Sequence, residues 1–180
     1  MMIHNNKQNI NMIDPELNSP WSFGYVGTLK KKSNSKILYQ DSIETICKFK
    51  TVKEFWWLMS LTVDNKKFPQ NIIPKELWIF RDDCIPDWNI AKKYAQIEKL
   101  ADISFNDMSK PQLLNLCMFC IGETLPDSND ILGLRIKKHN GTLNIRLWVK
   151  SQESAKRICK AVKEELATQC NSLVSSIKMF

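Results

Sequence analysis

The fold is read most directly from residues 134–148, whose sequence is LRIKKHNGTLNIRLW. Asn140-Gly141 is a strong signal for a two-residue turn, so this stretch predicts an antiparallel β-hairpin. With that turn, the residues on one face pair as Arg135 with Arg146, Lys137 with Asn144, and His139 with Thr142. The other face pairs only apolar residues, Ile136 with Ile145 and Leu134 with Leu147, and is predicted to face the core.

The two arginines therefore oppose each other, with Lys137 one pair away. Like charges opposed on a sheet destabilise it by roughly 0.2–1 kcal/mol, and a bound anion would offset that cost. Phosphate suits arginine geometry, and Trp148 lies on the same face beside Arg146. Recognition of a nucleotide end requires a phosphate-binding site beside an aromatic ring. The alternative is that the arginines extend into water and bind nothing.

Three helices are predicted outside the hairpin. Thr51 and Glu54 form a capping box that opens a helix to about residue 61. Ser109 caps a second helix, which Gly122 ends, and Ser151 caps a third. Helices interspersed with antiparallel strands predict an α+β fold, a single curved antiparallel sheet with three helices packed on the convex face.

The first two helices carry more apolar residues than one buried stripe requires. The core-facing positions are predicted to be Phe55, Leu58, Met59, Leu113, Leu116, Cys117 and Cys120. A second stripe remains, formed by Val52, Trp56, Leu114 and Met118. It belongs either to two deeply buried helices or to an exposed groove that accepts a partner helix.

Composition narrows the class of protein. The 180 residues suit one domain, predicted over residues 19–180 after a disordered, Asn-rich tail at 1–18. A net charge of +7 favours a polyanionic partner. Six tryptophans suggest that some of them stack on a ligand or lie at an interface; the alternative is a Trp-rich core.

Other classes are not supported by the sequence. The one C-x-x-C, Cys117 and Cys120, lies in an apolar helical run, and only two histidines are present, so neither metal nor cofactor is expected. No run approaches the roughly 20 apolar residues of a membrane span, and no signal peptide is evident, so a cytoplasmic location is expected. Without a nucleophile–base pair, carboxylate cluster or Gly-rich phosphate loop, the chain is not expected to be an enzyme.

An ordered series of landmarks resembles the family of eukaryotic translation initiation factor 4E, the messenger-RNA cap-binding protein, over roughly residues 20–167. The landmarks are Trp21, the segments KFKTVKEFW (48–56), IFRD (79–82), IPDW (85–88) and CIGE (120–123), the hairpin 133–148, and a final helix of the right length. In that family a curved sheet backed by three helices stacks the cationic 7-methylguanine between two aromatic rings.

The resemblance implies the site residues. Trp88 matches the second stacking ring, Tyr39 the first, and Trp148 the ring that touches the 7-methyl group. The positions implied to bind phosphate are Lys137 and Arg146, followed by Arg135 and Lys138, with His139 and Lys99 as further candidates.

One position departs from the family. Asn89 stands where the family has a Glu that accepts hydrogen bonds from guanine N1 and N2. Asn offers one acceptor and an NH2 group, which would face a donor at a cost of about 1–3 kcal/mol. Asp87 could substitute, a cap with altered N2 chemistry could be preferred, or cap binding could be weak.

The resemblance also implies a partner site. The family binds a helical segment of its scaffold partner, or of repressors, on the surface matched by Val52, Trp56, Leu114, Met118 and Gly122; Asn115 replaces a Glu usual there. The expected function is binding of the 7-methylguanosine cap of mRNA and recruitment of a scaffold for translation initiation. The alternatives are a divergent paralogue that represses translation or handles modified caps, and a protein-interaction module with a decayed cap pocket.

Overall fold

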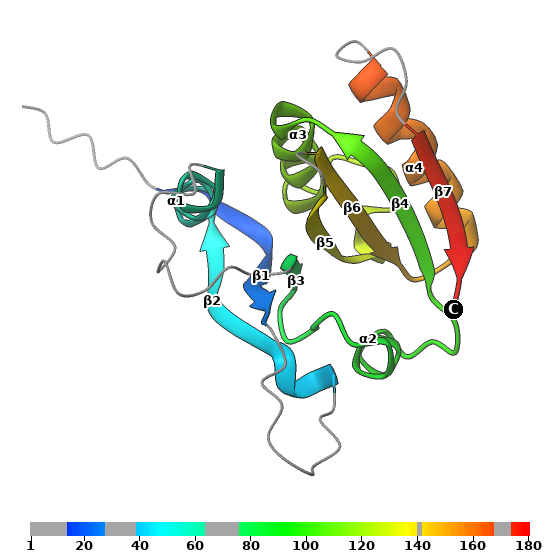
Figure 1. The fold of residues 1–180 in the computed structure, drawn as a ribbon, viewed down its shortest axis with the longest axis horizontal. Coiled ribbons are helices and arrows are strands. Elements are labelled where there is room, and N and C mark those ends of the chain that lie inside the picture. The colour runs from blue at the N-terminus through cyan, green and yellow to red at the C-terminus, as the bar shows by residue number, and fades with distance from the viewer. Residues whose placement is uncertain (1–13, 28–38, 64–75, 140–141, 168–173) are drawn as a thin grey trace, which may run out of the picture.

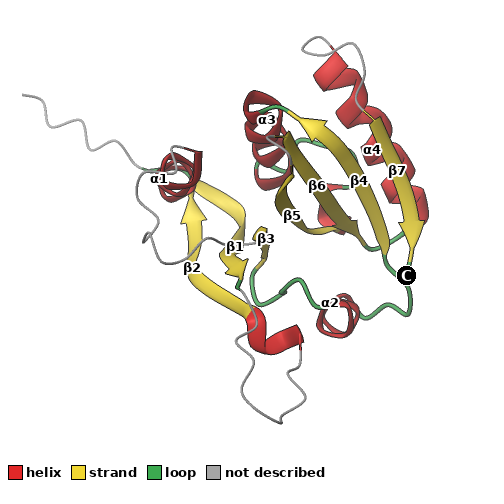
Figure 2. Cartoon of the chain, in the orientation of Figure 1, coloured by secondary structure: helices red, strands yellow, loops and turns green. Residues whose placement is uncertain are grey.

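The computed structural model describes residues 14–27, 39–63, 76–139, 142–167 and 174–180. The strands are β1 (Glu16–Val26), β2 (Ile43–Thr51), β3 (Glu76–Arg81), β4 (Ala101–Met108), β5 (Ile131–His139), β6 (Thr142–Val149) and β7 (Val174–Met179). The α-helices are α1 (Val52–Val63), α2 (Trp88–Ala95), α3 (Lys110–Ile121) and α4 (Gln152–Ala167), with short 3-10 turns at Tyr39–Ser42 and Ser128–Asp130 (Figures 1 and 2).

The strands form one antiparallel seven-stranded sheet in the order β2-β1-β3-β5-β6-β4-β7. The β5–β6 hairpin has the predicted register, including Arg135 opposite Arg146 and Lys137 opposite Asn144. Its turn residues, Asn140 and Gly141, lie outside the described residues. The predicted fold class, a curved antiparallel sheet backed by helices, is therefore confirmed.

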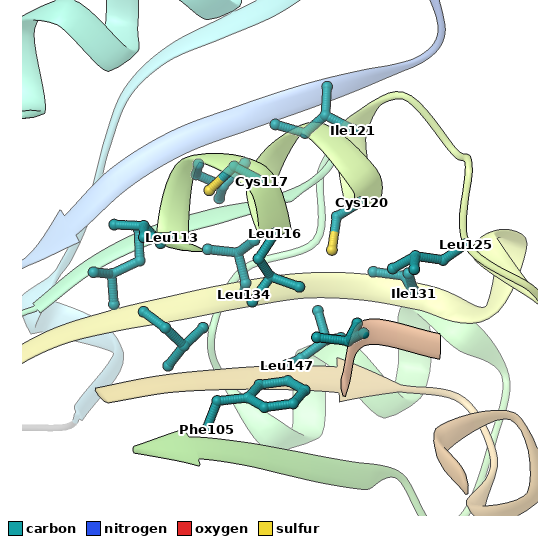
Figure 3. Packing of buried hydrophobic residues seen from close by; sticks show 14 of the residues in the cluster. Phe105, Leu113, Leu116, Cys117, Cys120, Ile121, Leu125, Ile131, Leu134 and Leu147 are labelled. Carbon is teal, nitrogen blue, oxygen red and sulfur yellow. The ribbon is translucent and has the colours of Figure 1, made fainter. Parts of the chain in front are cut away.

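The two faces of the sheet carry separate hydrophobic clusters, because successive strand residues point to opposite sides. Ile79 of β3 belongs to the larger cluster, which includes residues of α1, α3 and α4. Figure 3 shows α3 packing its buried stripe, including Leu116 and Cys120, against β5 and β6. The neighbours Trp78 and Phe80 belong to the smaller cluster, together with Ala91 of α2. Three helices thus cover one face, and α2 covers part of the other.

The helix ends follow the predicted capping signals. The Glu54 amide donates to Thr51 Oγ1 over 3.2 Å, and the Thr51 amide donates to Glu54 Oε2 over 3.1 Å. Ser109 forms a capping box with Gln112, and the Ser154 amide donates to Ser151 Oγ over 3.1 Å. These bonds satisfy amides that the first helical turn would leave without partners, so the three predicted helices begin where expected.

Three features differ from the prediction. A fourth helix, α2, follows Asp87, and the strand β7 pairs with β4 at the sheet edge. The strand β1 begins at Glu16, before the predicted domain boundary at residue 19, because Glu16 pairs with Thr51 of β2. Residues 16–18 are therefore part of the sheet, and residues 1–13 of the predicted tail lie outside the described residues.

A buried ion pair joins two of the sequence landmarks. Arg81 Nη1 lies 2.6 Å from Glu123 Oε1, and both side chains are only 9% exposed. The same guanidinium donates to Ser19 Oγ and to the carbonyl oxygens of Ile131 and Ser128. Burial acts to raise the pKa of Glu123, but hydrogen bonds from Arg81 and Ser19 outweigh it and lower that pKa. This network ties β1, β3, β5 and the end of α3 together.

Among the described helices, none is both long and apolar enough to cross a membrane.

Candidate functional site

Three aromatic rings meet where α2 lies on the sheet. The indole of Trp88, the first residue of α2, stacks on Trp148 of β6 with centroids 4.1 Å apart and planes 22° apart. Phe180, which follows β7, lies 4.4 Å from Trp88 at 33°. Trp148 has no exposed surface. It therefore offers a 7-methyl group no contact unless Trp88 moves, although the resemblance matched it to the ring that touches this group.

The packing around Trp148 holds its ring in place. Phe80 meets its ring edge-on, with centroids 5.3 Å apart and planes at 88°. Gly133 is the register partner of Trp148, and a Cβ there would clash with the Phe80 ring and the Ile79 carbonyl. The indole nitrogen donates to Asp102 Oδ2 over 3.2 Å. Trp148 is thus fixed from below and from the side.

The two opposed arginines are each neutralised by a carboxylate. Arg146 forms an ion pair with Asp102, and Arg135 forms one with Glu76, whose Oε2 lies 2.8 Å from Arg135 Nη2. Asp102 is fully buried, and burial raises its pKa although Arg146 favours its charged form. The repulsion that a bound anion was suggested to offset is therefore already offset by these two carboxylates, an arrangement that the sequence did not indicate.

Tyr39 is tied to this cluster through Arg135, whose Nη2 donates to the Tyr39 hydroxyl over 3.1 Å. Partial burial raises the pKa of that hydroxyl, and Arg135 opposes the rise. The Tyr39 ring is 40% exposed and makes no ring contact with Trp88. The two predicted stacking rings therefore lie near one cluster, but the rings that stack on Trp88 are Trp148 and Phe180, not Tyr39.

Most of the predicted phosphate-binding residues line one cavity of about 380 Å³, which we call the cationic cavity. Its lining consists of Glu76, Ser104, Asn106, Arg135, Lys137, Asn144, Ile145, Arg146 and Lys178. In the described part of the chain, neither Lys137 nor Lys178 forms an ion pair with a carboxylate. These two lysines are the cations best placed to meet an added anion.

Lys138 does not join this cavity. Strand alternation turns it away from Lys137, to the face of Ile136, and the structure leaves it exposed there. Lys138 therefore lies apart from Arg135, Lys137 and Arg146, the other residues predicted to bind phosphate. Lys99 is also exposed and lies outside the cavity lining, and the side chain of His139 lies outside the described residues.

The guanine-edge position, Asn89, is exposed in the first turn of α2. Asp87 caps that helix, and its Oδ1 accepts from the amides of Asn89 and Ile90, each over 3.0 Å. Asp87 is only 8% exposed. Because it is buried and engaged as a helix cap, Asp87 is poorly placed to replace the family Glu, whereas Asn89 can reach a ligand.

The predicted partner surface is partly exposed. Trp56 is 44% exposed, Gly122 is exposed, and Val52, Leu114 and Met118 are half-buried. Helix α1 packs over β2 and α3 packs over β1, so the two helices lie over neighbouring strands on one face. Asn115 is half-buried on α3 between these positions. The neighbouring Trp57 is 60% exposed and was not singled out from the sequence.

Four residues of the cluster were missed: Glu76, Asp102, Lys178 and Phe180. Local periodicity gave no signal for them, because each reaches the site through a strand pairing distant in sequence. Asp102, for example, is placed by its register opposite both Trp148 and Lys178. Among the described residues, no group of three His, Cys, Asp or Glu side chains could hold a metal ion.

The chain is similar to known proteins of one family. The family model described as "Eukaryotic initiation factor 4E" matches residues 16–176. A curated relative, eukaryotic translation initiation factor 4E of Dictyostelium discoideum, is 23% identical over 146 residues, which cover 81% of this chain and 56% of the relative. The chain thus spans little more than half of that relative's length.

Solved structures share the fold at low identity. C. elegans eIF4E-3, in complex with the 4E-binding protein Mextli and a cap analogue, gives a TM-score of 0.68 at 16% identity, over 92% of each chain. Schistosome eIF4E complexed with m7GpppG and 4E-BP gives a TM-score of 0.66 at 18% identity, over 92% of this chain and 89% of the other. Ascaris suum eIF4E-3 with an m2,2,7G cap gives a TM-score of 0.62 at 20% identity, over 86% of this chain and 85% of the other. The match of the family model over most of the sequence shows that the chain belongs to the eukaryotic initiation factor 4E family.

Proposed function

We propose that the chain binds the 7-methylguanosine cap of messenger RNA, without catalysis, by stacking the base between Tyr39 and Trp88. The observation that carries the proposal is the position of Trp88, whose ring centroid lies 4.1 Å from that of Trp148 and 5.8 Å from the guanidinium carbon of Arg146. Arg146 also lines the cationic cavity. A single nucleotide could therefore place its base on Trp88 and its phosphates in that cavity.

The chemistry of a methylated cap fits this cluster. A 7-methylguanine carries a positive charge, and electron-rich rings attract a cation over their faces. The triphosphate is anionic, and Lys137 and Lys178 are the lining cations without a carboxylate ion pair in the described chain. Trp88 must leave Trp148 for the base to enter, and this movement would also uncover Trp148 for the methyl group. The related structures solved with cap analogues support the same ligand.

The test is retention on immobilised 7-methyl-GTP and elution by free cap analogue. The parent should be retained, and Trp88→Ala should be lost from the resin. Tyr94→Ala is the matched control, because Tyr94 is a 41% exposed aromatic of the same helix α2. Retention of Trp88→Ala equal to that of the parent would show that the stacking proposal is wrong.

We further propose that Val52, Trp56, Leu114, Met118 and Gly122 receive a helical segment of an initiation scaffold or a repressor. The exposed indole of Trp56 beside half-buried apolar residues supports this role. Relatives solved with 4E-binding proteins support the kind of partner. Recovery of a scaffold that depends on Trp56 would favour an initiation factor, and recovery of a repressor alone would favour the regulatory paralogue. Both roles belong to the cytoplasm, where translation takes place.

A further inference from the structure

Both faces of Trp88 are occupied by rings of the protein itself. The Trp148 centroid lies 4.1 Å from that of Trp88, and the Phe180 centroid lies 4.4 Å away, with planes 22° and 33° from parallel. If Trp148 and Phe180 lay on the same face of Trp88 at these distances, their rings would overlap, because carbon atoms in contact stay about 3.5–4.0 Å apart. Trp148 and Phe180 therefore cover opposite faces, and no face of Trp88 is left for a base.

Phe180 is held in this position by the edge strand. Its amide donates to the Leu100 carbonyl over 3.0 Å, and its carbonyl accepts from the Leu100 amide over 3.1 Å. These bonds continue the β7–β4 ladder beyond the Met179–Ala101 pair. Figure 1 shows the end of β7 beside the segment that links α2 to β4. The backbone thus fixes the position of Phe180, while the residue remains 42% exposed.

The same strand also contributes to the cationic cavity. Lys178 pairs with Asp102 in register and lines the cavity, whereas Met179 points away, as expected from strand alternation. Docking of β7 therefore has two effects on the candidate site: it supplies a cation for phosphate and places a ring on Trp88. Only the second effect opposes a ligand.

We propose that Phe180 is an intramolecular competitor of the nucleobase: stacked on the outer face of Trp88, it holds the indole against Trp148 and opposes the movement that admits the base. The inference rests on the proposed function and adds a regulatory contact to the same site. A competitor within the chain lowers the population that is ready to bind, and so weakens every base by the same factor. Phe180 therefore sets the affinity of the site, but not its preference between a cationic and a neutral guanine.

The experiment compares the affinities of 7-methyl-GTP and GTP for the parent, Phe180→Ala and Met179→Ala. Phe180→Ala should tighten both ligands by the same factor, roughly threefold to tenfold from the loss of one aromatic pair. Met179→Ala changes an exposed neighbour on the same strand and should leave both affinities within about twofold of the parent's. Unchanged or weaker binding by Phe180→Ala, or a gain for one ligand only, would overturn the proposal.

A second readout follows Phe180 directly. In NMR spectra of protein with ring-labelled phenylalanine, the Phe180 signals are assigned by their loss in Phe180→Leu. Saturating 7-methyl-GTP should shift these signals, because the Phe180 ring leaves the ring-current field of the Trp88 indole. Resonances that stay in place at saturation would overturn the competition. If neither the parent nor Phe180→Ala binds either nucleotide, the proposed function fails, whereas equal binding by both contradicts only the role of Phe180.

Discussion

The indole of Trp88 lies flat on the indole of Trp148, with ring centroids 4.1 Å apart and planes inclined by 22°. This contact closes the candidate site, because it covers one face of Trp88 and leaves Trp148 with no exposed surface. A base that binds Trp88 must replace protein–protein stacking with stacking of its own. A cationic base is favoured in this exchange over a neutral one, since the charge adds attraction to the ring faces.

The two adjacent lysines of β5 provide a test of the cationic cavity. Lys137 lines the cavity, and Lys138 points to the opposite face. Lys137→Ala should weaken 7-methyl-GTP binding roughly threefold to tenfold and lower the salt dependence of log Kd by about one unit of slope. Lys138→Ala removes the same charge from the chain and should change affinity less than twofold. Equal effects of both substitutions in calorimetric titrations would rule out a local phosphate contact.

Substitution of Asn89 tests the guanine edge. Asn89→Glu restores two acceptors on an exposed side chain of α2 without disturbing the Asp87 cap, which binds only backbone amides there. The affinity for a 7-methylguanosine cap should rise about tenfold, within the roughly 1–3 kcal/mol of an unmet donor. A trimethylguanosine cap has no N–H at N2 and should gain less. If Asn89→Glu had the same preference between the two caps as the parent, Asn89 would have no role in base recognition.

Neighbouring tryptophans on α1 test the partner surface. Trp56 is 44% exposed and Trp57 is 60% exposed, so neither substitution empties the core. Trp56→Ala should weaken binding of a helical 4E-binding peptide at least about 30-fold, as expected for a tryptophan hot spot worth 2 kcal/mol or more. Trp57→Ala, on a different face of the helix, should retain peptide binding within about threefold. Cap affinity should be unaffected in both variants, and loss of cap binding in Trp56→Ala would indicate a folding defect instead.

The Arg81–Glu123 pair predicts a pH-dependent loss of stability. The pKa of Glu123 is lowered in the folded chain, so its carboxylate stabilises the fold fully above the ordinary value of 4.5 and loses that contribution as the pH falls through the lower, folded-state pKa. At pH 7, Glu123→Gln should reduce the free energy of unfolding by about 3 kcal/mol, because it breaks a buried pair. Below pH 4.5 the difference from the parent should shrink.

Glu164→Gln is the control for that measurement. Glu164 pairs with Lys160 on the surface of α4, where both side chains are largely exposed. Such pairs contribute little, so urea titrations should show a change below about 0.5 kcal/mol at either pH. A Glu123→Gln deficit that stays constant from pH 7 to pH 3 would contradict the role assigned to the charge.

Much of the fold could be predicted because its signals are local. The capping groups at Thr51, Ser109 and Ser151 each act within three residues, and the hairpin register follows from one turn. The helix α2 was missed because eight residues with a single buried side chain, Ala91, give little periodicity. Its one local signal was Asp87, which accepts from two amides as an N-cap and could have been recognised.

The site was only partly predictable, since its electrostatics depend on strand order. The sequence brought Arg135 and Arg146 together, but nothing local places Glu76 beside one and Asp102 beside the other. Those contacts arise because β3 adjoins β5 and β4 adjoins β6. The position of Phe180 depends likewise on β7 pairing with β4, so the occupied state of Trp88 could not be foreseen.

The central claim is that a cationic guanine stacks on Trp88, and the most direct measurement is the ratio of the affinities for 7-methyl-GTP and GTP. The two ligands share the same phosphates and differ only in the methyl group and the positive charge it brings. We predict that 7-methyl-GTP binds the parent roughly tenfold more tightly than GTP, and that Trp88→Ala removes most of this preference. Equal affinities of the parent for the two nucleotides would contradict the account.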